Sequence, residues 1–358
     1  MLTIYSEVSA IEDIYISDSY PNWQKVIGNG VNIYLNTDDA FLEQQLTGDN
    51  EEEESILFMW YHESDAPKRP KALGAQFQFA DDVASLIQQP FGLFILDIDK
   101  QKANDLSAKY GVQIYSSQEL VDIQDFEIDF DFEKNELVQC TTGALKGYGF
   151  ILNSFKTERS NSTIIVDRNI FANEERGSNV GVSNMIEYFD NTLPSAFETS
   201  YDILFVTQNN GRIANPHTRR KIIEDLTSEI KKLRTYDIDI EVLFVHSSTI
   251  LFEYTHQRRI LNNYHFGNSE HGFAIFSIND YYRVRNDNDF NIQVHYHSLL
   301  KNQLDNVSIK KRNKLLKRLK GIKVEAEKQL INQGQNDRYY RLYKNGAETY
   351  TIKNRLLS

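Results

Sequence analysis

Three consecutive segments decide the fold class: "FGLFILDI" at residues 91–98, "DKQKANDLSAKYG" at 99–111 and "VQIY" at 112–115. The first and third are apolar runs of strand length. The middle segment has a helical pattern that starts at Asp99, an N-cap residue type, and closes at Gly111, which suits a left-handed C-cap. Strand, helix and strand with short links are typical of a βαβ unit. We therefore expect an α/β fold with a mostly parallel sheet.

The residues around this unit predict a small α/β domain over 1–136. "SILFMWYH" (55–62) is interpreted as a further strand, and "SSQE" (116–119) has the spacing of a capping box that begins a helix. "DIQDFEIDFDFEKNE" (122–136) alternates acidic with apolar residues, which is typical of an edge strand but also fits a linker. We place the domain boundary at 136/137.

The second part of the chain predicts a separate α/β sandwich over 137–306, followed by a basic helical extension over 307–358. "NPHTRRKIIEDLTSEIKKLRTY" (215–236) is an amphipathic helix, and "SNMIEYFDNTLP" is also helical. The remaining segments are interpreted as strands, at 162–171, 201–208, 238–246, 249–266 and 271–278.

Composition and charge narrow the classes of protein. The chain has 358 residues, 41% of them hydrophobic and 25% charged, as in soluble proteins with a full core. The single cysteine, Cys140, fits a reducing compartment, and we expect a cytoplasmic protein without a signal peptide or transmembrane segment. Residues 1–150 carry 27 acidic and 9 basic side chains, whereas 151–358 carry 24 and 30. The second part is thus better suited to an anionic partner.

The stretch "THQRRILNNYHFGNSEHGF" (255–273) contains the most suggestive polar residues. His256 and Arg258 are two apart, so in a strand they project to the same side, and Asn263 follows at an expected chain reversal. These residues are compatible with a phosphodiester-cleaving site, with a phosphate-binding remnant of one, or with the polar edge of a strand.

The spacing of His256, Arg258 and Asn263 resembles the H-x-K motif, with its following Asp, of phospholipase-D-type phosphodiesterases. With "GFAIF" and the upstream "IIVDRNIF", the chain is more similar to the non-catalytic phospholipase-D-like domain at the C-terminus of microtubule-interacting-and-trafficking proteins and its bacterial relatives. The resemblance covers about residues 140–300.

The resemblance implies that His256 would be the nucleophile and Arg258 would hold the phosphate oxygens. Because arginine replaces the lysine and Asn263 replaces the acid, phosphate binding is expected to survive better than catalysis. Asn268 and His271 would line the same phosphate site. The alternative is a metal-independent nuclease or phosphodiesterase that needs a homodimer to pair two His256 residues.

The segment "SIKKRNKLLKRLKGIKVEAEKQLI" (308–331) predicts a basic amphipathic helix. It could follow a nucleic-acid backbone, lie on an anionic membrane as an adaptor, or pack on the sheet with solvated lysines. The nucleic-acid interpretation assigns binding to seven residues: Lys310, Lys311, Arg312, Lys314, Lys317, Arg318 and Lys320.

Other polar groups suggest no cofactor. Asp97 and Asp99, with Asp65, Asp81 or Asp82, could form a Mg²⁺ site, but local capping by Asp99 is the simpler interpretation. "HYH" (295–297) has no marked third zinc ligand. P-loop, G-x-G-x-x-G, G-x-S-x-G and C-x-x-C motifs are absent from the sequence.

The leading hypothesis is therefore a binding subunit that turns over little or no substrate. Its second part would recognise phosphate in nucleic acid or another ligand, and its acidic first part would contact a protein partner. The family resemblance also implies a place in a microbial antiviral defence or mobile-element system.

Overall fold

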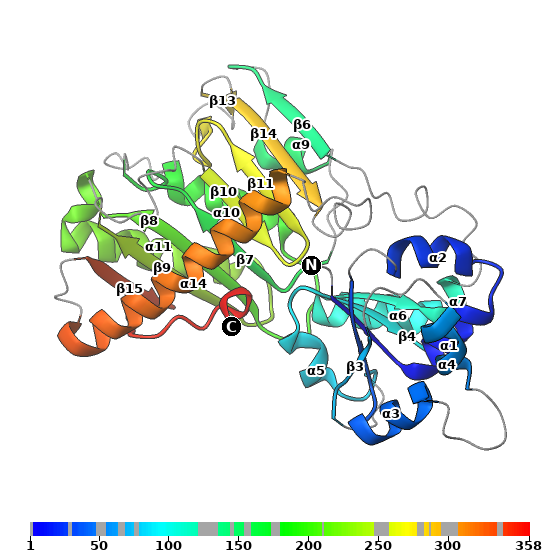
Figure 1. Cartoon of the computed structure of the whole chain (residues 1–358). Coiled ribbons are helices and arrows are strands. Elements are labelled where there is room, and N and C mark those ends of the chain that lie inside the picture. The colour runs from blue at the N-terminus through cyan, green and yellow to red at the C-terminus, as the bar shows by residue number, and fades with distance from the viewer. Residues whose placement is uncertain are drawn as a thin grey trace. The chain divides into compact units, whose positions relative to one another are not determined.

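The computed structural model describes most of the chain: residues 3–27, 31–47, 55–63, 69–74, 79–120, 135–143, 147–153, 159–172, 180–209, 211–246, 258–277, 283–285, 288–294, 307–334 and 339–358. The chain divides into two compact units (Figure 1). Unit 1 comprises Met1–Lys134 and Val294–Asn306, and unit 2 comprises Asn135–Gln293 and Val307–Ser358. The expected C-terminal extension, 307–358, is therefore an integral part of unit 2.

Unit 1 contains a five-stranded sheet in which every pair of neighbouring strands is parallel. The strand order is β3-β2-β1-β4-β5. The strands are β1 (Thr3–Ser6), β2 (Asn32–Leu35), β3 (Lys71–Ala72), β4 (Gly92–Leu96) and β5 (Gln113–Ser116). The helices are α1 (Val8–Ile16), α2 (Tyr20–Ile27), α3 (Asp39–Thr47), α4 (Ile56–Glu63), α5 (Val83–Gln88), α6 (Lys100–Tyr110) and α7 (Ser117–Leu120).

The expected βαβ unit is confirmed as β4–α6–β5. The side chain of Asp99 accepts a hydrogen bond from the backbone N–H of Lys102 at 2.8 Å and caps α6. Gly111 ends the helix with φ 61°, where a residue with a Cβ would be strained.

The strand predicted at 55–62 is wrong, because this segment forms helix α4. Its most buried residues, Leu57 and Trp60, are three apart, which is helical spacing. A short run in which nearly every residue is apolar has no periodicity that separates a strand from a buried helix.

Unit 2 is built on a nine-stranded mixed sheet of order β16-β15-β9-β8-β7-β10-β11-β14-β6. Its centre is parallel: β7 (Ser162–Val166), β8 (Tyr201–Gln208) and β9 (Ile238–Val245). The flanking strands are β6 (Asn135–Cys140), β10 (Arg258–Asn262), β11 (His265–Ser269), β14 (Asn288–Val294), β15 (Tyr340–Lys344) and β16 (Ala347–Glu348). A separate pair, β12 (Phe276–Ser277) and β13 (Arg283–Val284), is antiparallel.

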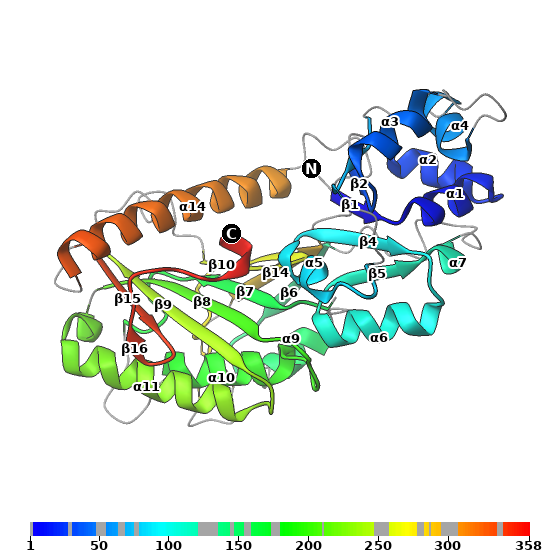
Figure 2. The ribbon, with the colours of Figure 1, turned by 90° about the horizontal axis from the view of Figure 1, so that it is seen from below.

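Helices cover both faces of this sheet (Figure 2). One face carries α9 (Gly147–Asn153), α10 (Val180–Thr192) and α11 (Pro216–Lys232), and the other carries the long α14 (Val307–Gln333). The predicted helices at 215–236 and 308–331 are confirmed as α11 and α14. A short 3-10 turn, η1 (Gly211–Ala214), precedes α11.

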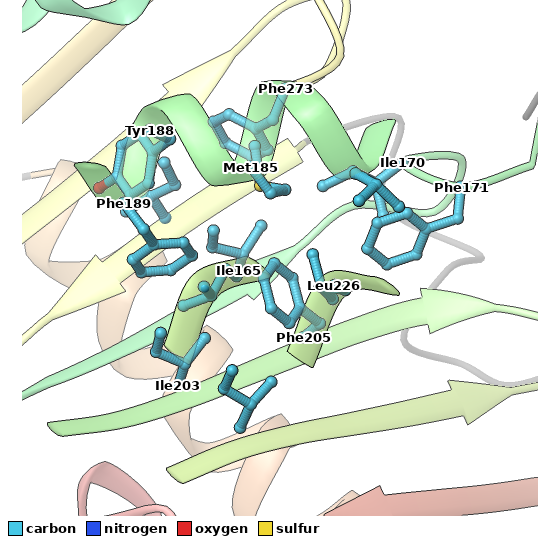
Figure 3. Packing of buried hydrophobic residues seen from close by; sticks show 14 of the residues in the cluster. Ile165, Ile170, Phe171, Met185, Tyr188, Phe189, Ile203, Phe205, Leu226 and Phe273 are labelled. Carbon is cyan, nitrogen blue, oxygen red and sulfur yellow. The ribbon is translucent and has the colours of Figure 1, made fainter. Parts of the chain in front are cut away.

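The main core of unit 2 lies between the sheet and helices α9 to α11 (Figure 3). Ile165, Ile203 and Phe205 of the central strands meet Met185 and Phe189 of α10, all at most 1% exposed. The faces of α11 and α14 that pack inward are apolar at helical spacing, with Leu315, Leu319, Ile322, Ala326 and Leu330 buried on α14. None of the helices in the described ranges contains an apolar stretch of the length that a membrane span requires.

The C-terminal segment contributes the β15–β16 hairpin, which the sequence interpretation missed. Asn345 (φ 51°) and Gly346 (φ 88°) form its turn, and β15 pairs with β9. An Asn-Gly pair between strand-like residues was the available signal, because both turn positions need positive φ. The sheet thus gains two strands from a segment expected to be a helical appendage.

Candidate functional site

Arg258 lies at the start of β10, beside the end of β7. The register pairs Arg259 with Val166, so Arg258 stands directly across from Asp167. The Arg258 Nε and Asp167 Oδ1 atoms are 3.9 Å apart, with the side chains 21% and 3% exposed. Arg258 also donates to the carbonyl of Glu270. The guanidinium that was predicted to hold phosphate is thus already next to a carboxylate.

Asp167 is held by backbone donors in the interior. It accepts hydrogen bonds from the N–H groups of Asn169 at 2.9 Å and Phe273 at 3.0 Å. Burial raises the pKa of its carboxyl, and these two bonds and the Arg258 charge oppose that rise. Because the ionised form of Asp167 offsets the charge of Arg258, the attraction of this arginine for an external anion is reduced.

The loop that joins β11 to β12 is fixed by buried side chains that the sequence did not single out. Tyr148 of α9 donates to the carbonyl of Phe273. Asn184 of α10 bonds both the N–H and the carbonyl of Phe276. Among the described residues of the strand predicted at 271–278, the strand β12 comprises Phe276–Ser277. These hydrogen bonds tie the loop and the start of β12 to helices α9 and α10.

Asn263, predicted to bind phosphate, is 1% exposed and serves a structural role. Its Oδ1 accepts from the N–H groups of Asn161 at 3.0 Å and Ser162 at 3.1 Å, and its Nδ2 donates to Asn161 Oδ1 at 2.9 Å. The side chain fastens the turn after β10 to the start of β7. This geometry leaves Asn263 unavailable to a ligand in solution.

The expected phosphate cluster is not gathered in one place. Arg258 begins β10 and Asn263 follows its end, so the strand holds them about 16 Å apart. Asn268 of β11 pairs with Arg259, and because neighbours in a strand alternate, both face away from Arg258. His271 is 53% exposed and lies 3.9 Å from the Glu270 carboxylate. His256 lies outside the described residues.

The predicted basic helix presents an exposed row of lysines. Lys311, Lys314, Lys317 and Lys320 are exposed, and Arg318 is half-buried. Lys320 donates to the carbonyl of Ser358 at 2.7 Å. The side chain of Lys310 lies outside the described part of the structure.

Arg312 departs from the predicted set of ligand-binding residues. It is 7% exposed, and burial lowers the pKa of its guanidinium to about 10. Its Nη1 donates to Asn313 Oδ1 at 3.3 Å. Arg312 lies on the side of α14 that packs on the protein. It therefore cannot contact a ligand on the outer side of the helix.

The charge along α14 runs against the helix dipole. Residues 307–320 contain seven basic and no acidic residues, while 321–333 contain two of each sign. Cations near a helix N-terminus and like charges three or four residues apart both destabilise a helix. The amphipathic packing of α14 compensates for this cost, and a bound polyanion would remove much of it.

Three described acidic residues of unit 1, Glu7, Asp82 and Asp99, have local structural partners. Glu7, which follows β1, accepts from the N–H groups of Asp97 at 2.8 Å and Phe79 at 3.1 Å, and burial raises the pKa of its carboxyl. Asp82 caps α5 and Asp99 caps α6. Among the residues that the structure describes, no three His, Cys, Asp or Glu side chains could hold a metal ion. Asp65 and the histidines at 295 and 297 lie outside them.

Comparison with known proteins adds no family. No family model matches the chain, and no curated protein matches it. Among solved structures, the Argonaute protein from Methanocaldcoccus janaschii aligns with 12% identity over 81% of this chain, with a TM-score of 0.16. The alignment spans 40% of that Argonaute chain. A TM-score this low carries no argument about fold or function.

Proposed function

We propose that unit 2 binds nucleic acid through the outward side of α14, as a binding subunit without turnover. The observation that carries the proposal is a set of four exposed lysines in a half-helix that has no acidic residue. Lys314 and Lys317 lie at the middle of the exposed side, and Lys311 and Lys320 flank them about a quarter turn to either side. Such a row neutralises phosphates and releases their counterions, which supplies most of the affinity in sequence-independent binding.

The arrangement of the charges favours a polyanion over a structural role. Lysines that merely keep a helix soluble are usually mixed with acids at spacings of three or four residues, where each pair is slightly stabilising. In residues 307–320, by contrast, every charged side chain at these spacings is positive. A row of phosphates is the ligand that turns these repulsions into attractions.

An anionic membrane is the weaker candidate for the same surface. The large apolar side chains of α14 that are strongly exposed, among those described, are Val324 and Ile331, each 66% exposed. At about 25 cal/mol per Å² of apolar surface, two such side chains contribute only a few kcal/mol on insertion. Interfacial helices bury a whole apolar side, whereas the apolar side of α14 is packed on its own sheet.

The family resemblance and the role of unit 1 remain part of this proposal. The order β7, α10, β8, α11, β9, β10, β11 is compatible with a phospholipase-D-like domain, and the pairing of Arg258 with Asp167 favours a degenerate site. Unit 1, with its acidic surplus, would contact a protein partner. A defence or mobile-element system in the cytoplasm is the setting that the resemblance implies.

Binding of a labelled DNA duplex, followed by fluorescence anisotropy over a salt series, tests the proposal. We expect log Kd to vary with log salt with a slope of about 3 to 4, as four neutralised phosphates require. The double variant Lys314→Glu, Lys317→Glu should lose at least about tenfold in affinity. The matched control Lys231→Glu, Lys232→Glu makes the same charge change on α11, on the other side of the sheet, and should bind as the wild type does.

Equal losses in both double variants would mean that only net charge matters, and the proposal would fail. Flotation with anionic vesicles that exceeds duplex binding would establish the membrane alternative instead. Cleavage of the duplex in EDTA that disappears in His256→Ala would establish the nuclease alternative.

A further inference from the structure

Gly321 stands in the middle of α14, where the packing of the protein gives no reason for a glycine. It is exposed, and a Cβ built on it would meet nothing within 4 Å. Glycine in a helix interior is destabilising relative to alanine, because it loses more backbone freedom on folding. A contact with something outside the protein is a physical reason for leaving this position without a side chain.

The neighbours of Gly321 give the outer side of α14 a saddle-shaped profile. Lys317 and Lys314 lie one and two turns before it, and Val324 and Lys328 lie one and two turns after it; all four are exposed. The row is thus lowest at the glycine, slightly higher at the valine, and ends in long charged side chains. The exposed Glu325 lies beside this row, four residues after Gly321, and its carboxylate accepts a hydrogen bond from Gln329 Nε2 at 3.2 Å. Lys314 and Lys328 are 14 positions apart, about 21 Å along the helix axis.

We propose that the nucleic acid bound by unit 2 is a duplex, and that its sugar–phosphate backbone crosses α14 at Gly321. This inference rests on the function proposed above. A convex double helix that crosses an α-helix touches it at one point and recedes on both sides. The missing side chain allows the close approach, and lysines on both sides extend to the receding phosphates. Lys328 thereby becomes a ligand-binding residue.

The composition of α14 favours a duplex over a single strand. Proteins that hold single strands stack bases on aromatic side chains, and residues 307–333 contain no aromatic residue. The outward row consists of lysines, a glycine and a valine, which offer little hydrogen-bond recognition of base edges. The contact is therefore with the backbone, and the binding is independent of sequence.

Two leucine substitutions test the crossing point. Gly321→Leu adds a side chain of good helix propensity at the proposed contact, and Ser228→Leu adds the same side chain at an exposed position of α11. We expect Gly321→Leu to raise the melting temperature of unit 2 yet weaken duplex binding about tenfold, and to lower the salt slope by about one unit for each phosphate that the lysines no longer reach. Ser228→Leu should leave the affinity unchanged, and Lys328→Glu should weaken binding as Lys314→Glu does.

The outcomes separate this inference from the proposal beneath it. If Gly321→Leu binds the duplex as tightly as the wild type while Lys314→Glu, Lys317→Glu does not, the backbone does not cross at Gly321 and the inference is overturned. Tighter binding of a single strand of the same sequence would also overturn it. If neither the leucine nor the lysine variants change the affinity, the proposed function itself has failed.

Discussion

Replacing one lysine on the outer side of α14 should stabilise the protein while weakening its binding. Lys314 has four basic neighbours at helical spacing, two before it and two after it: Lys310, Lys311, Lys317 and Arg318. Like-charge pairs at these spacings each cost about 0.2 to 0.5 kcal/mol in a helix. Lys314→Glu converts all four repulsions into attractions and keeps good helix propensity.

The magnitude follows from the pair energies. Each pair changes by about 0.4 to 1 kcal/mol, because a repulsion is replaced by an attraction of similar size. Lys314 is exposed, so screening at physiological salt reduces the sum over the four pairs to about 1 kcal/mol. For a unit of this size, that corresponds to a rise in melting temperature of about 2 to 4 °C. The affinity for a duplex should fall at the same time, and the salt slope should drop by about one unit.

Calorimetric melting at low and high salt, combined with anisotropy titrations, checks both effects in one preparation. The gain in melting temperature should be largest at low salt and shrink as salt is added, since screening weakens the repulsions that the substitution removes. Lys231→Glu on α11 serves as the control for an equal change in net charge. A melting temperature that falls at low salt, or a duplex affinity that stays at the wild-type value, would refute the argument from α14 charge.

Two further predictions concern the stability of unit 2. Burial raises the pKa of Glu241 to about 7, above its ordinary value of 4.5. The folded state therefore binds the proton more tightly, and the free energy of unfolding should fall as the pH rises between these two values. Glu241→Gln should reduce this pH dependence in urea unfolding, and an unchanged dependence would exclude Glu241 as its source. Gly147 has φ 74°, and a Cβ there would lie 1.7 Å from Glu187 Oε1, whereas Gly143 has φ 75° with nothing within 4 Å. Gly147→Ala should cost more than the roughly 1 to 2 kcal/mol expected from the backbone alone in Gly143→Ala, because Glu187 must move and give up the hydrogen bond that it accepts from the Tyr148 N–H at 2.9 Å. Equal unfolding free energies of the two variants would contradict this cost.

Local patterns account for the elements that the sequence predicted well. The helix α6 was predictable because local residues fix both of its ends: Asp99 caps the first turn, and Gly111 adopts the positive φ that ends the helix. The apolar side of α14 was also predictable from its period, since its buried apolar residues recur at helical spacing. In contrast, 55–62 has apolar residues at nearly every position, and only packing within unit 1 makes it the helix α4.

The candidate residues divide in the same way. The sequence showed that the first half of α14 is basic with no acidic residue. It did not show that Arg312 is buried, because that depends on which side of the helix packs against the sheet. The spacing of Arg258 and Asn263 suggested one pocket. The strand between them instead places Asn263 against Asn161 at one end of β10 and Arg258 beside Asp167 at the other. Both partners belong to a segment that is distant in the sequence.

By itself, the sequence determined the α/β class, the caps of the helices and the sign of the charge on α14, because these depend on residues within a few positions of one another. Only the tertiary structure decided the strand orders, the inclusion of the C-terminal hairpin in the large sheet, and the partners of Arg258, Asn263 and Arg312. Those features follow from pairing and burial between distant segments, and a local pattern has no information about which distant surface a side chain will meet.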